Sequence, residues 1–346
     1  MADFSLCDTP SKLDAALVEL RSATHIALDC EGQNLGQEGG KLSLISVSPI
    51  SLKKDSPPIF LVDAVALDDR TLAPLFDLLR SNKPIKVVFD GRMDYSELAY
   101  RHGAQINGVL DLQLADIRSR TLRGESREGQ LKRLSPYLHR GQVGGQPSAY
   151  ASVHRLNGLE SCAREHGVRT TPKLDGPFIH DNWMKRPLRD DSLEYAARDI
   201  RLLAGVYACF QEKSYMDECD LLLQSQKYVS LWDAPPRSHD TYKSHPLLPL
   251  DILQLPSSRE ALVECVGCKR RLTTQSFSKT GLRLPSKRRC WVCLAVSVQQ
   301  HTKQQWDRDD DLDCEYSDEY SGFGDSYGND SYHDFDRDNY GYDGDW

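Results

Sequence analysis

The pattern of apolar and polar positions in the first part of the chain predicts three strands. Apolar runs at 25–32, 41–49 and 59–67 are short, contain many β-branched residues and are separated by turns rich in Gly, Lys, Ser and Pro. Such runs are typical of strands, and short turns between them favour antiparallel pairing. The segment from 25 to 67 is therefore predicted to be an antiparallel meander.

After the third run, the spacing of apolar residues becomes helical. The segments 71–81, 93–103 and 111–122 have helical spacing, and 85–91 has the pattern of a strand. The predicted order is three strands, helix, strand, helix, strand, helix. It indicates the α/β class, with a mixed sheet that starts antiparallel, continues through parallel crossovers and is flanked by helices.

The rest of the chain divides into segments of different character. Residues 123–157 break the periodicity and predict a long loop or short irregular helices. Helical spacing resumes at 158–168, and 192–213 is the longest uninterrupted helical pattern. Residues 231–251 have the Pro and Ser content of a linker, so we place a domain boundary there.

Length and composition narrow the class of protein. A chain of 346 residues exceeds one ordinary domain and predicts a large domain plus something smaller. No segment resembles a secretion signal, and no run approaches the ~18 apolar residues of a membrane span. We therefore expect a soluble, intracellular protein of the cytoplasm or nucleus with no membrane partner. The net charge of −8 argues only superficially against a nucleic-acid partner, because the tail carries most of the excess acid.

Two acids lie on the first of the three predicted strands. Asp29 and Glu31 are two positions apart, so their side chains project from the same face and can share one cation. Neighbouring carboxylates repel each other unless one is protonated or a metal ion lies between them, and a hard ion such as Mg²⁺ accepts oxygen ligands of this kind.

Three more residues extend this candidate site. Asp94 follows an apolar strand directly, at the start of a helix, where ligand sites of α/β sheets commonly form. Tyr195 and Asp199 are separated by four positions and lie on one helix face. Each feature alone has a simpler explanation, such as a chance Asp-x-Glu pair, a helix cap or a half-buried helix face. Their order along the chain favours one shared site.

The set resembles the DEDD exonuclease superfamily, in the RNase D-like branch that has a tyrosine in its third motif. The resemblance covers about residues 5–213 and includes the sequence WMKRPL at 183–188. The position five before Asp199, where the other branch has a histidine, is Glu194. The resemblance implies a ribonuclease H-like fold and a metal-dependent 3′-5′ exonuclease.

The resemblance also implies a role for each residue of the set. Asp29, Glu31 and Asp199 would hold the Mg²⁺ or Mn²⁺ ion that activates water, and Asp29 would bridge to a second ion. Asp94 would reach that second ion largely through water, and Tyr195 would orient the attacking water. Two ions ~3.5–4 Å apart suit an in-line displacement at a phosphodiester.

Ten cysteines occur in the chain, six of them scattered singly and four in two close pairs. Two CxxC pairs about twenty residues apart have the spacing of a closed structural Zn²⁺ site. The predicted ligands are Cys265, Cys268, Cys290 and Cys293. Basic residues lie between the pairs without an intervening acid, which is typical of a nucleic-acid contact, although a protein-interaction module remains an alternative.

Candidate contacts to a nucleic-acid backbone are basic or aromatic. Lys41 and Arg92 flank the acidic motifs, but solvated surface charge is the simpler interpretation of both. Arg133 and Tyr137 belong to a basic loop that is a better candidate for guiding a strand, together with His139. The cysteine region adds four arginines, namely Arg270, Arg271, Arg288 and Arg289.

The sequence therefore predicts four parts. These are an exonuclease domain (5–215), a helical extension and linker (216–260), a zinc module (261–300) and a disordered acidic tail (301–346). The leading hypothesis is a 3′-5′ exonuclease that acts on RNA or single-stranded DNA, with RNA preferred by family resemblance. The rival is a catalytically inactive nucleic-acid-binding adaptor that recruits partners through the zinc module.

Overall fold

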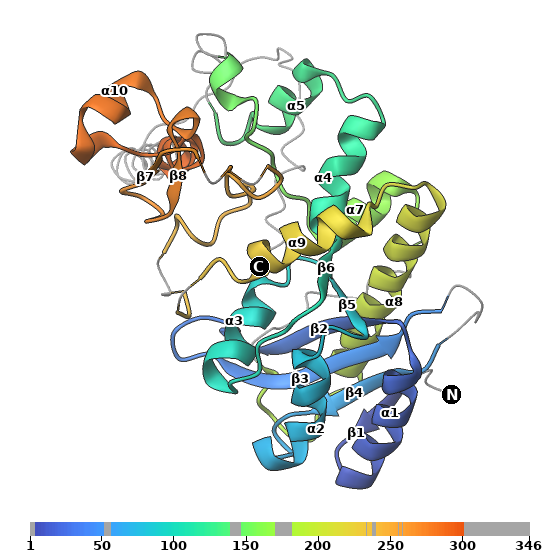
Figure 1. Cartoon of the computed structure of the whole chain (residues 1–346). Helices are drawn as coiled ribbons and strands as arrows, with labels where there is room; N and C mark the ends of the chain where they lie inside the picture. Colours follow the sequence, from blue (N-terminus) through green and yellow to red (C-terminus); the bar gives the residue numbers. More distant parts are fainter. Residues whose placement is uncertain are drawn as a thin grey trace, which may run out of the picture. The chain divides into compact units, whose positions relative to one another are not determined.

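A six-stranded mixed sheet organises the larger part of the chain in the computed structural model (Figure 1). Its spatial order is β1-β4-β3-β2-β5-β6. The strands are β1 (Phe4–Cys7), β2 (His25–Gln33), β3 (Lys41–Pro49), β4 (Ile59–Asp63), β5 (Ile85–Val88) and β6 (Val109–Asp111). Strands β2, β3 and β4 pair antiparallel, whereas β1 with β4, β2 with β5 and β5 with β6 pair parallel. The predicted antiparallel start and parallel crossovers are confirmed.

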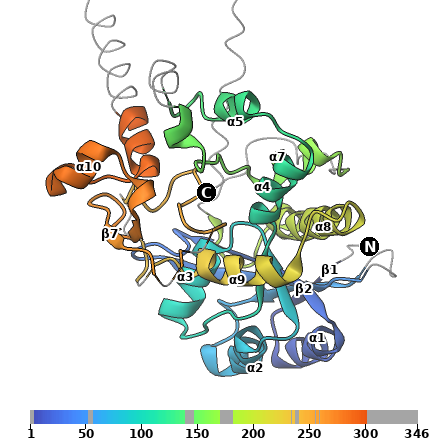
Figure 2. The same cartoon turned by 45° about the horizontal axis from the view of Figure 1, so that its top comes forward.

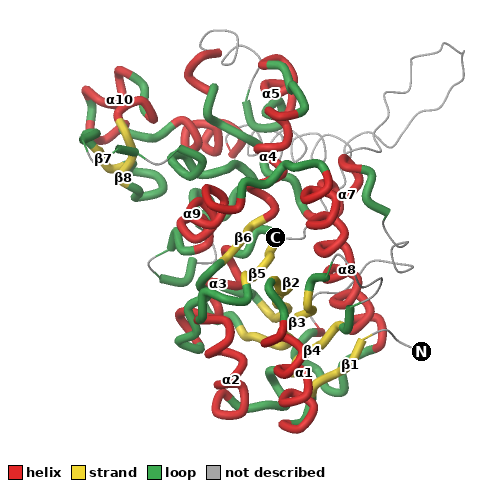
Figure 3. The backbone as a smooth tube through the Cα atoms, turned by 45° about the vertical axis from the view of Figure 1, so that its right-hand side comes forward, coloured by secondary structure: helices red, strands yellow, loops and turns green. Residues whose placement is uncertain are grey.

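Helices cover both faces of this sheet, as the tube in Figure 3 shows in red around the yellow strands. They are α1 (Pro10–Ser22), α2 (Asp69–Arg80), α3 (Arg92–Arg101), α4 (Leu112–Leu122), α7 (Leu159–His166), α8 (Asp190–Glu212) and α9 (Glu218–Val229). Helices α1 and α2 lie side by side on one face (Figures 1 and 2). Helix α8 packs on the other face, against β2, β3 and β4. The five helices predicted between residues 71 and 213 are all present.

The strands bury side chains on both faces of the sheet, and each face has its own hydrophobic core. Ala27 and Leu44 belong to the core beneath α8, whereas Ile26, Leu28 and Ile45 belong to the core beneath α1 and α2. Because side chains alternate along a strand, the odd-numbered positions of β2 point towards α8. This alternation directs Asp29 to the α8 face.

The first twenty-four residues hold two elements that the sequence analysis missed, β1 and α1. Strand β1 has four residues, too few to show a clear period. Helix α1 buries Leu13, Leu17 and Leu20, which have the helical spacing that could have revealed it. The third predicted strand is shorter than expected. It ends at Asp63, because this carboxylate accepts the backbone N–H groups of Val65 and Ala66 and starts a turn.

The region after α8 packs more closely than a linker. Helix α9 buries Leu221 and Tyr228, and the hydroxyl of Ser225 on α9 accepts the backbone N–H of Asp111 at 2.8 Å. Within 231–251, the side chains of Leu247 and Leu248 are fully buried. Helix α9, which follows residue 215, contacts β6, α3 and α4 of the predicted exonuclease domain. The predicted division into four parts stays a prediction.

The irregular segment 123–157 contains α5 (Arg127–Arg133) and a short 3-10 turn (Pro147–Tyr150). The cysteine region contains a two-stranded hairpin, β7 (Leu262–Glu264) and β8 (Arg271–Thr273), and helix α10 (Lys279–Arg283). Two further 3-10 turns are Thr274–Ser276 and Pro285–Lys287.

The structure describes residues 4–51, 57–138, 147–169, 182–232, 234–236, 240–254, 256–257 and 259–300. None of the helices in these ranges is long and apolar enough to cross a membrane. The predicted acidic tail at 301–346 and His139 lie outside the described residues.

Candidate active site and cysteine cluster

Strand β2 presents Asp29 and Glu31 next to an irregularity in its pairing. The register with β3 shifts between Glu31 and Gly32, which is a β-bulge. A Cβ atom at Gly32 would lie 2.1 Å from the carbonyl oxygen of Lys41, so only glycine fits there. The bulge thus lies directly after Glu31, two residues before the end of β2.

Helix α8 brings the third acid to the same place. Ala196 and Ala197 are fully buried, and such small side chains allow the helix to approach the sheet closely. Asp199 lies on this helix and is half-buried. Asp29, Glu31 and Asp199 each offer one oxygen, and these oxygens lie within 4.8 Å of one another. The predicted convergence of a strand pair and a helix residue is therefore present.

Electrostatics at these acids favours a bound cation. Burial and the charge of Asp199 raise the pKa of Asp29 to about 8. Burial, followed by the charge of Asp29, raises the pKa of Asp94 well above its usual value. The backbone N–H of Cys30 opposes both shifts by hydrogen bonding. A hard cation among these oxygens would offset the repulsion, so the donor set fits a divalent ion with oxygen ligands.

Asp94 lies in the first turn of α3 and is buried, so it is not an exposed helix cap. The turn before it is held by Asp111, whose carboxylate accepts the backbone N–H groups of Asp90 and Gly91 at 3.1 and 3.0 Å. Asp90 has a positive φ of 55°. This strained turn directs α3, and with it Asp94, towards Asp29.

Arg92 does not have the exposed position expected of a phosphate contact. Its side chain is only 3% exposed, and it donates to both oxygens of Asp90 at 2.5 and 2.7 Å. Its guanidinium carbon also lies 5.0 Å from the ring centre of Tyr228. Arg92 therefore belongs to the interior, buried against an acid and an aromatic ring, and the expected surface position is wrong.

Tyr195 lies one turn before Asp199 on α8. Its ring meets that of Trp183 edge-on, with the ring centres 6.2 Å apart. The neighbouring Glu194 accepts a hydrogen bond from Arg201 at 2.8 Å and is partly exposed. By its spacing of four residues, Tyr195 shares a helix face with Asp199, whereas Glu194 does not.

The four predicted cysteines also come together. Their sulfur atoms lie within 4.8 Å of one another. Cys265 and Cys268 flank the turn between β7 and β8, and the backbone N–H of Cys290 donates to the sulfur of Cys265 at 3.2 Å. A Cβ atom at Gly267 would lie 2.9 Å from the sulfur of Cys293, so glycine is needed for this close approach. Four converging thiols fit the zinc module that the spacing predicts.

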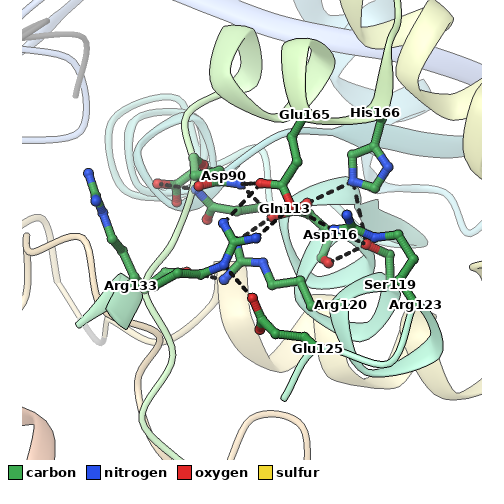
Figure 4. A network of polar contacts seen from close by, with 12 residues as sticks. Asp90, Gln113, Asp116, Ser119, Arg120, Arg123, Glu125, Arg133, Glu165 and His166 are labelled. Atoms are coloured by element: carbon green, nitrogen blue, oxygen red, sulfur yellow. Dashed lines mark hydrogen bonds and ion pairs between the residues drawn. The ribbon is translucent and has the colours of Figure 1, made fainter. Parts of the chain in front are cut away.

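The other candidate nucleic-acid residues differ in accessibility. Arg133 is held by Glu125 and by both oxygens of Glu165 in the network drawn in Figure 4. The ring of Tyr137 is buried, so it offers no open face for stacking on a base. Lys41 and Arg271 are exposed, whereas the three other arginines of the cysteine region are half-buried, namely Arg270, Arg288 and Arg289.

A second group of metal-type side chains lies in the same network. Asp116, Cys162 and His166 are all buried and each offers a ligand atom within 4.8 Å of the others. However, Asp116 is already paired with Arg120 at 2.5 Å and with His166 at 3.0 Å (Figure 4). A carboxylate neutralised by arginine has little to offer a cation, so this group ties α4 to α7.

Comparison with known proteins supports the assignment of the fold. Two structures of RNase D from Trypanosoma brucei are similar. The structure in complex with RNA U12 has a TM-score of 0.53 and 22% identity, covering 81% of this chain and 87% of that one. A second crystal structure of the same RNase D has a TM-score of 0.52 and 21% identity, covering 81% and 89%. No curated protein sequence matches the chain.

The family comparison covers the domain that holds the carboxylates. A family model described as 3′-5′ exonuclease matches residues 4–214. This range is more than half of the chain and contains all four acids and Tyr195. The protein therefore belongs to the 3′-5′ exonuclease family.

Proposed function

We propose that the protein hydrolyses the terminal phosphodiester at the 3′ end of RNA with the help of two Mg²⁺ or Mn²⁺ ions. The observation that carries this proposal is the meeting of one oxygen each from Asp29, Glu31 and Asp199 within 4.8 Å. These acids come from a strand and a distant helix, so chance proximity along the chain does not explain their convergence. RNA is proposed because a similar structure, RNase D of Trypanosoma brucei, was solved with RNA U12.

Each residue has a separate task in the proposed reaction. Asp29, Glu31 and Asp199 would hold the cation on the side of the attacking water. Asp29 would also contribute to a second cation site, which Asp94 would help to form from α3. When bound, the ions would supply an activated water and neutralise charge on the entering and leaving oxygens. The hydroxyl of Tyr195 would form a hydrogen bond with the attacking water and direct this water to the phosphorus.

The cysteine cluster and its basic residues are proposed to bind zinc and the RNA backbone. A zinc ion on Cys265, Cys268, Cys290 and Cys293 would fix the hairpin between β7 and β8. Arg271 on β8 is exposed, and no acid occurs in the sequence between the first and last of these cysteines, although Glu264 lies opposite Arg271 in the hairpin. Such a surface contributes sequence-independent phosphate contacts. Single-stranded DNA offers the same phosphates and is the comparison substrate.

The contribution of this surface is tested by replacing Arg271 and Arg288 together with alanine. We expect weaker RNA binding. The slope of the logarithm of affinity against the logarithm of salt concentration should become shallower by roughly 0.7 per lost phosphate contact. Arg21→Ala on α1 removes an exposed charge at a distance and serves as the control. Equal salt slopes for the double variant and the wild type would remove this surface from the proposal.

Hydrolysis itself is tested with RNA labelled at its 3′-terminal nucleotide, in the presence of Mn²⁺. We expect release of the labelled mononucleotide by the wild type, and a loss of ~10³-fold or more in Asp29→Ala and Asp199→Ala. Asp191→Ala is the matched control, because this acid lies on the same helix, is more than a third exposed and, within the part of the chain that the structure describes, forms its ion pair with the nearby Arg189. Similar rates in all four proteins would indicate a contaminating nuclease and contradict the proposal.

A further inference from the structure

The segment with the sequence WMKRPL, at 183–188, is tied to the sheet by one arginine. The guanidinium of Arg186 donates to both oxygens of Asp63, at 2.7 and 2.6 Å. Asp63 is 3% exposed and lies at the end of β4. A bidentate pair of this kind fixes the orientation of both partners. The segment before α8 is therefore anchored to a strand that lies more than a hundred residues earlier in the chain.

The remaining donors of Arg186 complete the anchor. One terminal nitrogen donates to the carbonyl oxygen of Trp183 at 2.8 Å, and the other donates to the carbonyl oxygen of Ser43 at 3.1 Å. The hydroxyl of Ser43 donates to the same Trp183 oxygen at 2.5 Å. The backbone of Trp183 is thus held by β3 directly and by β4 through Arg186.

This anchor determines where the Trp183 ring lies. The ring is 2% exposed and meets Tyr195 edge-on at 6.2 Å between ring centres. Edge-to-face pairs hold two rings in a defined relative orientation. Tyr195 belongs to α8 and lies one turn from Asp199. A path of direct contacts therefore runs from Asp63 through Arg186 and Trp183 to Tyr195.

We propose that Arg186 is a positioning residue of the active site, which acts through Trp183 to hold Tyr195 at the carboxylate cluster. This inference rests on the proposed function, because it assigns a geometric task within that reaction. Small displacements of a group that orients a reactant lower rates strongly, and an error of ~1 Å costs about 10²-fold. The side chain of Arg186 is half-buried, and its guanidinium is already bound by Asp63 and Ser43, so its proposed role does not require a contact with RNA.

Arg186→Lys is the substitution that tests this role. Lysine keeps the charge beside Asp63 but cannot form the two-pronged contact or reach Trp183 and Ser43 at once. We expect kcat for RNA to fall about 10–100-fold, with KM changed less than about threefold. In the Tyr195→Phe background, the same substitution is expected to lower kcat less than about threefold, because the group that it positions is already lost.

The controls separate positioning from a general loss of structure. Arg189→Lys alters a neighbouring, exposed arginine whose ion pair among the described residues is with Asp191, and we expect wild-type kcat. Equal losses of kcat from Arg186→Lys in the wild-type and Tyr195→Phe backgrounds would show independent effects and overturn the proposal. A rise in KM with unchanged kcat would overturn it as well.

Hydrogen exchange of the amides in 182–188 and 193–199 distinguishes failure of the anchor from failure of the proposed function. Faster exchange in both segments of Arg186→Lys is expected even if the wild type hydrolyses no RNA. Unchanged exchange there would overturn the positioning role, whatever the activity. An inactive wild type with faster exchange in the variant would contradict the proposed function and leave Arg186 as an anchor of Tyr195.

Discussion

At the scale of single residues, the hydroxyl of Tyr195 is the most selective test of the proposed chemistry. Tyr195→Phe keeps the ring against Trp183 but removes the group that orients water. We expect kcat to fall ~10–10³-fold while the melting temperature stays nearly constant. Single-turnover hydrolysis of RNA and thermal unfolding measure these two quantities.

A second tyrosine on α8 is the matched control for that substitution. Tyr207 is buried and lies two turns after Asp199 on the same helix. Its hydroxyl accepts a hydrogen bond from the side-chain amide of Gln211 at 2.9 Å. We expect Tyr207→Phe to leave kcat unchanged. Comparable losses of kcat in both variants would mean that the effect comes from the helix rather than from the Tyr195 hydroxyl.

A second residue-scale prediction concerns Asp111, which holds the turn before Asp94. Burial and the charge of Asp90 raise the pKa of Asp111 to about 7, although three backbone N–H groups oppose the shift. The unfolded chain titrates this carboxyl near ~3.9. Between about pH 4 and about pH 7, this carboxyl is protonated to a greater extent in the folded state than in the unfolded chain. The contribution of Asp111 to the free energy of unfolding therefore falls as the pH rises from about 4 to about 7 and is constant above that.

Denaturant unfolding at pH 5, 6, 7 and 8 without divalent cations measures this effect. We expect the stability of the wild type to fall relative to Asp111→Asn by at most ~1.4 kcal/mol per pH unit, because asparagine does not titrate. The lost hydrogen bond of the asparagine adds an offset that is the same at every pH. A difference between the two proteins that does not change with pH would contradict the raised pKa.

The residues that sequence reasoning placed correctly share a feature that Arg92 and Tyr137 lack. Asp29, Glu31 and Asp199 have side-chain directions fixed by the strand and helix periods, so their faces follow from the sequence. Arg92 was misplaced because its burial depends on Asp90 and on a tyrosine of α9, far along the chain. A charged residue gives no sequence signal that it will be buried when its partners come from tertiary contacts.

At the scale of elements, the β-bulge of β2 controls the position of Glu31. In Gly32→Ala, the added Cβ would lie 2.1 Å from the Lys41 carbonyl oxygen, which β3 holds in its pairing with β2. We expect a loss of about 2–3 kcal/mol in the free energy of unfolding, and a lower affinity for Mn²⁺ because Glu31 moves. Urea unfolding and calorimetric titration with Mn²⁺ measure the two effects.

Gly158 supplies the control for this substitution. It caps the N-terminus of α7, and a Cβ atom there would meet nothing within 4 Å. The free energy of unfolding of Gly158→Ser is expected to lie within about 0.5 kcal/mol of the wild-type value, since serine is a good N-cap residue. A Gly32→Ala protein as stable as Gly158→Ser would show that the bulge has room to adjust.

The elements were easier to predict than the contacts between them. Long periodic segments such as α2 and α8 have many apolar positions in register, and their existence follows from the sequence. Strand β1 is too short for such a signal, and its place beside β4 depends on parallel pairing across the sheet. The segment at 231–251 has the composition of a linker, yet Leu247 is buried by contacts that its local sequence does not reveal.

At the scale of the whole molecule, the cysteine cluster shares a hydrophobic core with the irregular segment after α4. The four cysteines pack in one cluster with Leu134, Tyr137, Tyr150, Val153 and Leu247. The rings of Tyr150 and Trp291 meet edge-on at 5.5 Å. A metal ion at the cysteines would therefore be coupled to the order of 127–138 and 147–153, although those segments contain none of the four cysteines.

Removal of the metal from the cysteine cluster is predicted to loosen this shared core and to spare the carboxylate site. Cys268→Ala should bind less than a tenth of the zinc of the wild type, for which metal analysis should find about one ion per chain. We expect faster hydrogen exchange in 127–138 and 147–153, and unchanged exchange in β2 and α8, because these lie in separate hydrophobic cores. Cys219→Ala removes an exposed cysteine of α9 and should change neither quantity. If a zinc-free Cys268→Ala protein exchanged the amides of 127–138 and 147–153 at the wild-type rate, apolar packing alone would hold these segments. Faster exchange in β2 of the same protein would show that the cysteine cluster and the carboxylate site are coupled.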